Sequence, residues 1–137
     1  MSAWNAINKT IYDVFKADGT LTGMLATGTP IYYQQAPDKQ TYPFVVFSWQ
    51  TGNDDNDTPR RAKDMILWAR AFSIAGPAQA GSIDARMDTL LNSQALTVSG
   101  WSNFYTARET DVALVENLPD NNKVWQAGGM YRIRISE

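Results

Sequence analysis

The chain has 137 residues, 14 of them acidic and 12 basic, a size that suits one domain able to bury a hydrophobic core. It contains no cysteine and no histidine, which excludes disulfides, thiolate nucleophiles, histidine bases and the commonest transition-metal ligands. The slightly acidic balance argues against a protein whose main task is to bind nucleic acid, because such domains are normally basic.

The N-terminal segment predicts an amphipathic helix from about Ala3 to Lys16. Its apolar residues recur at helical spacing, Ser2 can cap its first turn, and Asp18 followed by glycine can end it. The segment "TLTGML" predicts a further short turn of helix, and Ile31 to Tyr33 a short strand. This N-terminus has no basic region and no continuous apolar region, and no apolar run approaches the roughly 20 residues of a membrane span. We therefore expect a protein made in a cytosol, with no membrane partner.

Two apolar segments, "TYPFVVFSWQ" and Lys63 to Ser73, predict strands. In the second, Met65 and its alternate neighbours form one face, which we assign to the core. The opposite face carries Ile66, Trp68 and Arg70. Both faces hold apolar groups, which is more than a sheet with one solvated face requires. Tryptophan and arginine dominate the energetics of protein interfaces, so we predict that Ile66, Trp68 and Arg70 form a subunit interface, the alternative being a local satellite cluster within the subunit.

Between these strands lies the densest charge of the chain, "TGNDDNDTPRRAKD", residues 51 to 64. A calcium loop of the EF-hand type needs a glycine at its sixth position and a glutamate at its twelfth, and neither is present. The stretch holds no apolar residue that could anchor it between Gly52 and Arg61. We expect Gly52 to Arg61 to be a mobile, solvated hairpin tip with no metal.

After this hairpin, "AGPAQAGSIDARMDTLLN" predicts the second main helix, and the remainder predicts strands, ending with one from Val124 to Ser136. The fold class is therefore α+β. We expect residues 1–137 to form a single domain with a mainly antiparallel sheet, a mixed sheet being the alternative, two main helices packed on one face and a long charged β-hairpin loop. The residues expected in the core are Ile7, Ile11, Val14, Phe15, Val45, Phe47, Ile83, Met87 and Leu90.

No motif for catalysis or for a cofactor is present. Glu109 and Asp111, two residues apart on an expected strand, share a face, and Arg108 is expected to point away from both. A solvated strand face explains this acidic pair better than glycosidase chemistry does. The Gly128-Gly129 pair indicates a bulge or a close approach of two backbones. We therefore expect no catalytic residue, no cofactor and no enzyme activity.

One part of the chain resembles a known family. The segment "KADGTLTGML", the following "IYYQQAPDKQTYPFVVF", the charged loop, the strand "MILWARAFS" and the helix "PAQAGSIDARMDTLLN" together resemble the tail terminator, or tail completion, proteins of long-tailed bacteriophages. The likeness covers most of residues 5 to 92. After the second main helix the sequence departs from the family pattern, except for the alternating last strand.

The resemblance implies a structural virion protein that forms a ring, usually a hexamer, which caps the tail tube and joins the tail to the head. The implied partners are further copies of the chain, the tail tube protein and a head–tail connector or stopper protein, with DNA passing through the ring without sequence-specific binding. The implied location is the tail–head junction of the virion, after synthesis in the bacterial host cytoplasm. The charged stretch, with Asp54, Asp55, Asp57, Arg60 and Arg61, would then be an assembly loop that faces a neighbouring protein or the DNA channel.

Two other functions stay open at this point. The chain could be another neck component, such as a head completion or connector protein. It could also be a small non-enzymatic domain that binds a peptide or a metabolite. A ring or an oligomer that depends on concentration favours a virion assembly protein, whether a tail terminator or another neck component. A strict monomer favours a binding domain.

Overall fold

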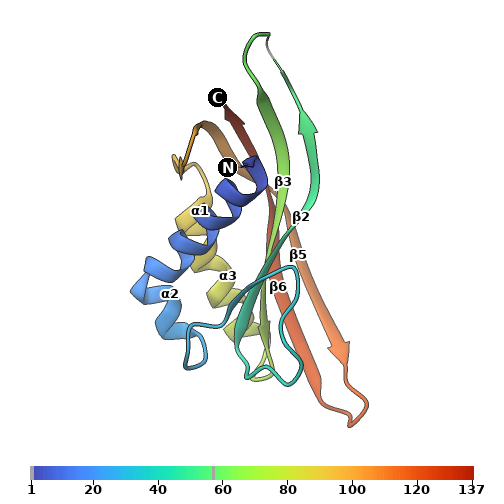
Figure 1. Ribbon diagram of the computed structural model, residues 1–137. Coiled ribbons are helices and arrows are strands. Elements are labelled where there is room, and N and C mark those ends of the chain that lie inside the picture. The colour runs from blue at the N-terminus through green and yellow to red at the C-terminus, as the bar shows by residue number, and fades with distance from the viewer. Residues whose placement is uncertain (1, 57) are drawn as a thin grey trace.

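The computed structural model describes residues 2–56 and 58–137, and this part of the chain confirms the α+β class. Three helices, α1 (Ala3–Ala17), α2 (Gly19–Met24) and α3 (Pro77–Leu91), lie on one side of a sheet, and none of the described residues forms a helix on the other side (Figure 1). The described strands are β1 (Ile31–Tyr33), β2 (Phe44–Asp54), β3 (Ala62–Ser73), β4 (Thr97–Val98), β5 (Trp101–Asn117) and β6 (Lys123–Ser136).

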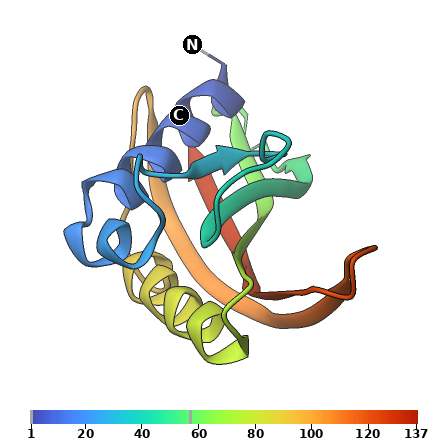
Figure 2. The ribbon, with the colours of Figure 1, turned by 90° about the horizontal axis from the view of Figure 1, so that it is seen from below.

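The described strands form one mixed sheet in the order β1-β2-β3-β6-β5-β4. β1 pairs with β2 in parallel, and every other described pair is antiparallel. The sheet is strongly curled, so that its strands wrap around the helices when seen from below (Figure 2). β5 carries two irregularities, between Asn103 and Tyr105 and between Arg108 and Thr110. These bulges break the two-residue alternation, which explains why the sequence of β5 looks irregular.

The junction between α1 and α2 depends on one carboxylate. Ser2 caps the start of α1 by accepting a hydrogen bond from Asn5 N at 3.1 Å. Asp18 has extended backbone, which ends α1, and its carboxylate accepts a hydrogen bond from Leu21 N at 2.8 Å, which caps α2. Arg86 of α3 donates two further hydrogen bonds to this carboxylate, at 2.8 and 2.7 Å. Asp18 therefore holds all three helices in their relative positions.

The hydrophobic core fills the space between the helices and the sheet. Seven of the nine residues expected in the core are buried, whereas Val14 and Leu90 lie at its margin. At the end of α3, Leu90 is partly buried and packs against the core, and Leu91 is fully buried. Leu91 follows Ile83 and Met87 at intervals of four residues, so the three side chains line one stripe of the helix, and Leu90 falls beside it.

Small residues let α3 lie close to the middle of the sheet. Ala69 and Ala71 of β3 are fully buried beneath it, and they pair with Gly129 and Ala127 of β6. A Cβ added at Gly128 would collide with the backbone carbonyl of Ala69. The expected close approach at the Gly128-Gly129 pair is therefore confirmed. Gly128 lies against the backbone of β3, and the missing side chain of Gly129 leaves space for the Arg108 guanidinium.

Candidate functional site

The side of the sheet without helices is the most distinctive surface of the molecule. We call it the open face and define it by Ile66, Trp68, Arg70 and Phe72 of β3 with their neighbours across the strands. Because side chains alternate along a strand, these residues point away from the buried Met65, Leu67, Ala69 and Ala71. The sequence placed Ile66, Trp68 and Arg70 opposite the core, and the structure has them there.

The centre of the open face is a stack of aromatic rings around a guanidinium. Arg70 Cζ lies 4.0 Å from the centroid of the Trp68 ring and 5.3 Å from that of Phe72, distances at which the cation is attracted to the ring faces. Phe72 stacks on Phe44 of β2 with centroids 4.8 Å apart, and Tyr42 and Tyr32 continue this aromatic surface. Tyr32 lies on β1, which pairs with β2, and Tyr42 lies in the segment just before β2, so the pairing of β1 with β2 brings rings from separate segments to one surface.

Arg70 differs from every other partly buried arginine of the described chain. Each of those binds a carboxylate, whereas the Arg70 side chain makes no hydrogen bond or ion pair with any described residue. Burial lowers the pKa of Arg70 below its usual range, against an opposing influence from Glu116. Three buried polar atoms in this region also lack a hydrogen-bond partner: Trp68 Nε1, Arg70 Nε and Gln126 Oε1.

The charged hairpin tip is shorter than the sequence predicted. β2 continues to Asp54, and pairs Asn53 with Asp64 and Asp54 with Lys63. Lys63 Nζ also binds the Asp54 carboxylate, which lowers the pKa of that carboxyl. Because the strand ladder extends this far, the segment between β2 and β3 comprises only residues 55–61.

Within that segment, Asp55 is bound to β6. Asp55 N donates a hydrogen bond to Ala62 O at 2.9 Å, and the Asp55 carboxylate accepts one from Arg134 Nη2 at 2.7 Å. Arg60 and Arg61 are exposed beside it. Asp57, the remaining predicted residue, lies outside the described residues.

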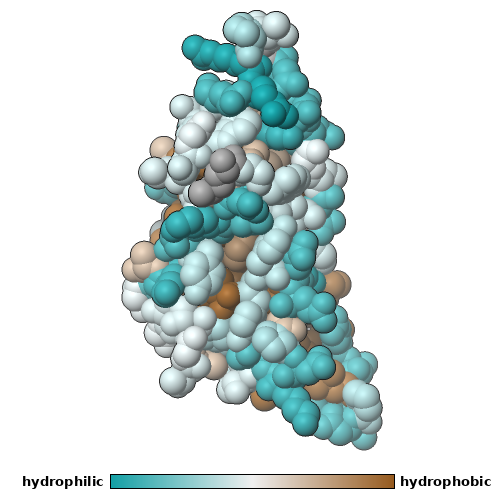
Figure 3. Space-filling view, viewed as in Figure 1, coloured by the Kyte–Doolittle hydropathy of each residue, from teal (hydrophilic) through white to brown (hydrophobic). Residues whose placement is uncertain are grey.

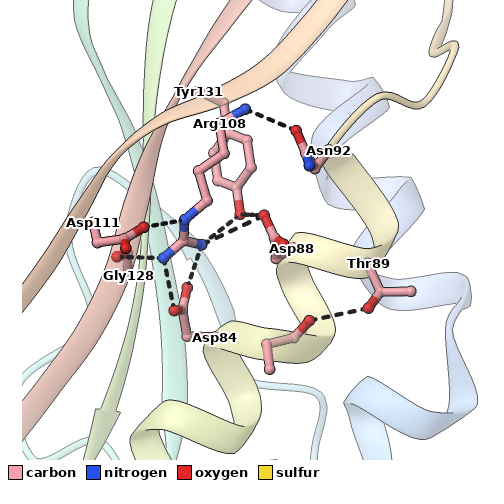
Figure 4. A network of polar contacts seen from close by, with 9 residues as sticks. Asp84, Asp88, Thr89, Asn92, Arg108, Asp111, Gly128 and Tyr131 are labelled. Carbon is pink, nitrogen blue, oxygen red and sulfur yellow. Dashed lines mark hydrogen bonds and ion pairs between the residues drawn. The ribbon is translucent and has the colours of Figure 1, made fainter.

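A polar network around Arg108 joins α3 to β5 and β6 (Figure 4). Arg108 donates two hydrogen bonds to Asp84, at 2.9 and 2.8 Å, and others to Asp111, the Tyr131 hydroxyl and the Gly128 carbonyl. Hydrogen bonding to Asp84 raises the pKa of Arg108 above its usual range. Burial raises the pKa of the Tyr131 hydroxyl, although Arg108 opposes this shift.

This network corrects the sequence-based expectation for Arg108. The residue was expected to point away from Asp111, but it donates a hydrogen bond to that carboxylate at 2.6 Å, whereas Glu109 binds Arg132 on the open face. The bulge between Arg108 and Thr110 changes the alternation and turns Arg108 towards the helices. Gly129 makes this possible, since a Cβ there would lie 2.5 Å from Arg108 Cζ. With its carboxylates bound to Arg108, the network is suited to holding elements together.

A groove between α1 and residues 94–99 is the other concave surface worth testing as a site. It has a volume of about 690 Å³ and a mostly apolar lining. Its charged groups, Lys9 and Asp13, bind each other, and the hydroxyl of Thr10 donates to the Thr97 carbonyl at 2.8 Å. Ligand sites usually present a few free polar groups that orient the ligand. The groove offers few, so it gives little support to a metabolite-binding domain.

Two further searches covered the described residues. Among residues 2–56 and 58–137, no group of three or more acidic side chains lies close enough together to hold a metal ion. In the same ranges, none of the helices combines the length and the apolar character needed to cross a membrane.

Comparison with solved structures finds the whole architecture elsewhere. A chain from the virion of a native gene transfer agent (GTA) particle superposes with a TM-score of 0.78 and 17% sequence identity, over 99% of this chain and 98% of that one. The two chains share one fold. No family model and no curated protein matches the sequence. At 17% identity the likeness is one of fold, and it extends through β5 and β6, where the sequence resembled no family pattern except in the last strand.

Proposed function

We propose that this protein is a structural component of a bacteriophage-like virion, and that its copies form a ring, a hexamer, that caps the tail tube and joins the tail to the head. The observation that carries the proposal is the similarity to a GTA virion chain over nearly the full length of both chains. Because the match covers 99% of this chain and 98% of the other, neither chain contains an additional domain that the other lacks. Two proteins with the same architecture and a similar role would give such a match, although fold alone does not fix function.

The surface of the molecule supports an assembly role. An uncovered sheet face with tryptophan, arginine and phenylalanine at its centre has the composition of an interface core. A specific interface buries about 1,600 Å² in total, of which a few anchors supply most of the energy. We propose Trp68 as such an anchor, with Ile66 and Arg70 beside it, in the contact between neighbouring copies.

The charged hairpin tip has a separate part in this proposal. The tip of the β2–β3 hairpin, to which Asp54, Asp55, Arg60 and Arg61 belong, lies at the opposite end of the molecule from the turn between β5 and β6 (Figure 1). There they can contact the tail tube protein or the connector or stopper protein, or face a channel through which DNA passes. The tip carries both signs of charge, which suits a contact with protein or a channel that does not hold DNA by sequence.

Light scattering of the purified protein across a range of concentrations, with electron microscopy of the same samples, tests the ring. We expect a closed oligomer for the unmodified chain. Trp68→Ala should remove the oligomer while the thermal unfolding transition of the monomer stays cooperative. A chain that stays monomeric at every concentration and in the presence of tail tubes would contradict the proposal, and particles that lack the protein but keep joined tails would assign it to another part of the neck.

A further inference from the structure

Two oppositely charged side chains of the open face, Arg70 and Glu116, form no ion pair with any described residue. The other arginines of this face, Arg132 and Arg134, bind carboxylates of the same subunit. Arg70 is partly buried on aromatic rings, and a charge that loses water without gaining a partner costs free energy. The acid that remains for Arg70 on its own face is therefore Glu116.

Gln126 of β6 lies between these two charges. It pairs with Phe72 across the strands, and Arg70 Cζ is 5.3 Å from the centroid of the Phe72 ring. On its other side, Gln126 Nε2 donates a hydrogen bond to Glu116 Oε1 at 2.5 Å. Gln126 Oε1 and Arg70 Nε are buried and have no hydrogen-bond partner, so one patch holds an unused acceptor and an unused donor. Diagonal neighbours across two strands lie within reach of long side chains.

Glu116 belongs to the end of β5 that extends past the helices. This end lies at the lower edge of Figure 1, and Figure 3 shows hydrophobic atoms among hydrophilic ones there. The carboxylate acts on Arg70 from this position, since it raises the pKa of the guanidinium against the larger lowering by burial. Opposite charges on such a patch attract more strongly when water leaves, because the effective dielectric constant falls.

We propose that, when the next copy in the ring covers the open face, the Arg70 guanidinium turns from the Trp68 ring to Gln126 Oε1 and to the Glu116 carboxylate of its own subunit. The inference rests on the proposed ring and adds which groups neutralise the charge that assembly buries. In the free subunit, water solvates the guanidinium on its ring. Once water is excluded, an unpaired charge costs free energy, and the pair within the subunit removes that cost. The covering surface therefore needs no carboxylate of its own.

Exchange of the two charges within one chain is the first test. Arg70→Glu alone and Glu116→Arg alone each place two like charges under every covered face, and each should weaken association by about 30-fold or more. A double variant with both changes should restore association to within about fivefold of the unmodified chain. Asp38→Arg, the same change of charge at an exposed acid, is the matched control and should not rescue Arg70→Glu.

Mixing the two single variants separates a pair within the subunit from a pair between copies. With an internal pair, every subunit of the mixture still contains two like charges, and no rings form. A pair between Arg70 of one copy and Glu116 of the next would be restored, because the two variants can alternate around the ring. At a concentration at which the unmodified chain assembles, we expect rings from the double variant and none from the equimolar mixture.

The isolated subunit gives a measurement that does not depend on the ring. Below the concentration of assembly, Glu116→Arg should lower the thermal midpoint by about 2 °C more in the chain that keeps Arg70 than in an Arg70→Met background, since only the former holds two like charges. In roughly 1 M NaCl this difference should shrink, because salt screens exposed charges.

The outcomes separate the inference from the ring itself. Rings from the double variant, with none from the mixture, support the internal pair. Normal rings from either single variant, rings from the mixture, or a folded double variant that does not assemble overturn it and leave the proposed function intact. Equal midpoint shifts in the two backgrounds also overturn it. A failure of the unmodified chain to assemble at any concentration or on tail tubes contradicts the proposed function, and the midpoint shifts then decide whether the two charges interact.

Discussion

The two faces of the sheet differ in how their apolar and charged side chains are covered and paired. On the face covered by helices, the apolar side chains are sealed, and the one arginine that enters the layer, Arg108, binds carboxylates on the helix and on a strand. On the open face, Trp68 and Phe72 stay partly exposed, and Arg70 has no anion. The covered face is complete within one chain, whereas the open face has the composition of a core and lacks its second layer.

The largest expected effect is on the free energy of unfolding when one isoleucine on each face is replaced by alanine. Ile11→Ala, in the fully buried layer beneath α1, should lower the free energy of unfolding by about 2–5 kcal/mol, because the helices cannot close the resulting cavity. Ile66→Ala, on the open face, should cost about 1 kcal/mol or less. Urea denaturation measures both, and equal costs would show that the open face is as tightly packed as the core.

The two arginines provide the next comparison. Arg108→Met removes the partner of Asp84 and of the Tyr131 hydroxyl, and should lower the free energy of unfolding by about 2–3 kcal/mol. Arg70→Met keeps an unbranched side chain on the aromatic rings and removes an unpaired charge, so stability should stay the same or rise. If Arg70→Met unfolds as readily as Arg108→Met, then Arg70 has a structural role inside the subunit.

A smaller effect, dependent on pH, is expected only on the covered side. The hydrogen bonds from Arg86 hold the pKa of Asp18 below its ordinary value of 3.8. The ionised carboxylate therefore stabilises the fold above pH 3.8, and this contribution is lost as the pH falls through the lowered pKa. Asp18→Ala should cost about 1 kcal/mol at pH 7 through the lost helix cap. Urea titrations at pH 7, 5 and 3 should show the difference from the unmodified chain shrinking, and a constant difference would assign the effect to packing.

The smallest effect on stability is expected at the hairpin tip. Replacement of residues 55–60 by a short Gly-Ser turn removes the exposed Asp55–Arg134 pair, worth less than about 1 kcal/mol. The subunit should therefore unfold at nearly the same temperature, while joining of tails to heads, scored by electron microscopy of particles, should fall. Unimpaired joining would leave the tip as a solubilising turn, and a large loss of stability would show that it supports β2 and β3.

How much of this comparison the sequence could predict depends on the range of the interactions. The helices and the strands β2, β3 and β6 follow from local periodicity, and the alternation along β3 already places Trp68 and Arg70 on the face away from the core. Residue by residue the pattern is less exact, because Leu90 and Leu91 both belong to the apolar stripe predicted for α3 but only Leu91 is fully buried. A rotation of α3 by part of a turn decides between them, and packing sets that rotation.

The state of each arginine could not be predicted, because it depends on contacts between distant segments. Arg108 reaches Asp84 only because a bulge turns it and Gly129, far along the chain, leaves space for it. Arg70 has no ion-pair partner across the strands, because its neighbours there are Val46 and Gly128. Single sequences do not show bulges or the register between strands directly. The open face as a surface could be foreseen, but the unpaired cation at its centre could not.

The bulges of β5 have one more consequence, for the behaviour of the chain before it meets its neighbours. β4 pairs only with Trp101 and Ser102, so most of the outer edge of β5 has no strand partner among the described residues, although Ser93 and Asn92 bind Thr106 O and Arg108 N. A long, flat edge of this kind recruits strands from other molecules and starts amyloid-like aggregation. Two bulges and the acidic Glu109, Asp111 and Glu116 interrupt this edge. They act as gatekeepers that stop newly made chains from pairing edge to edge.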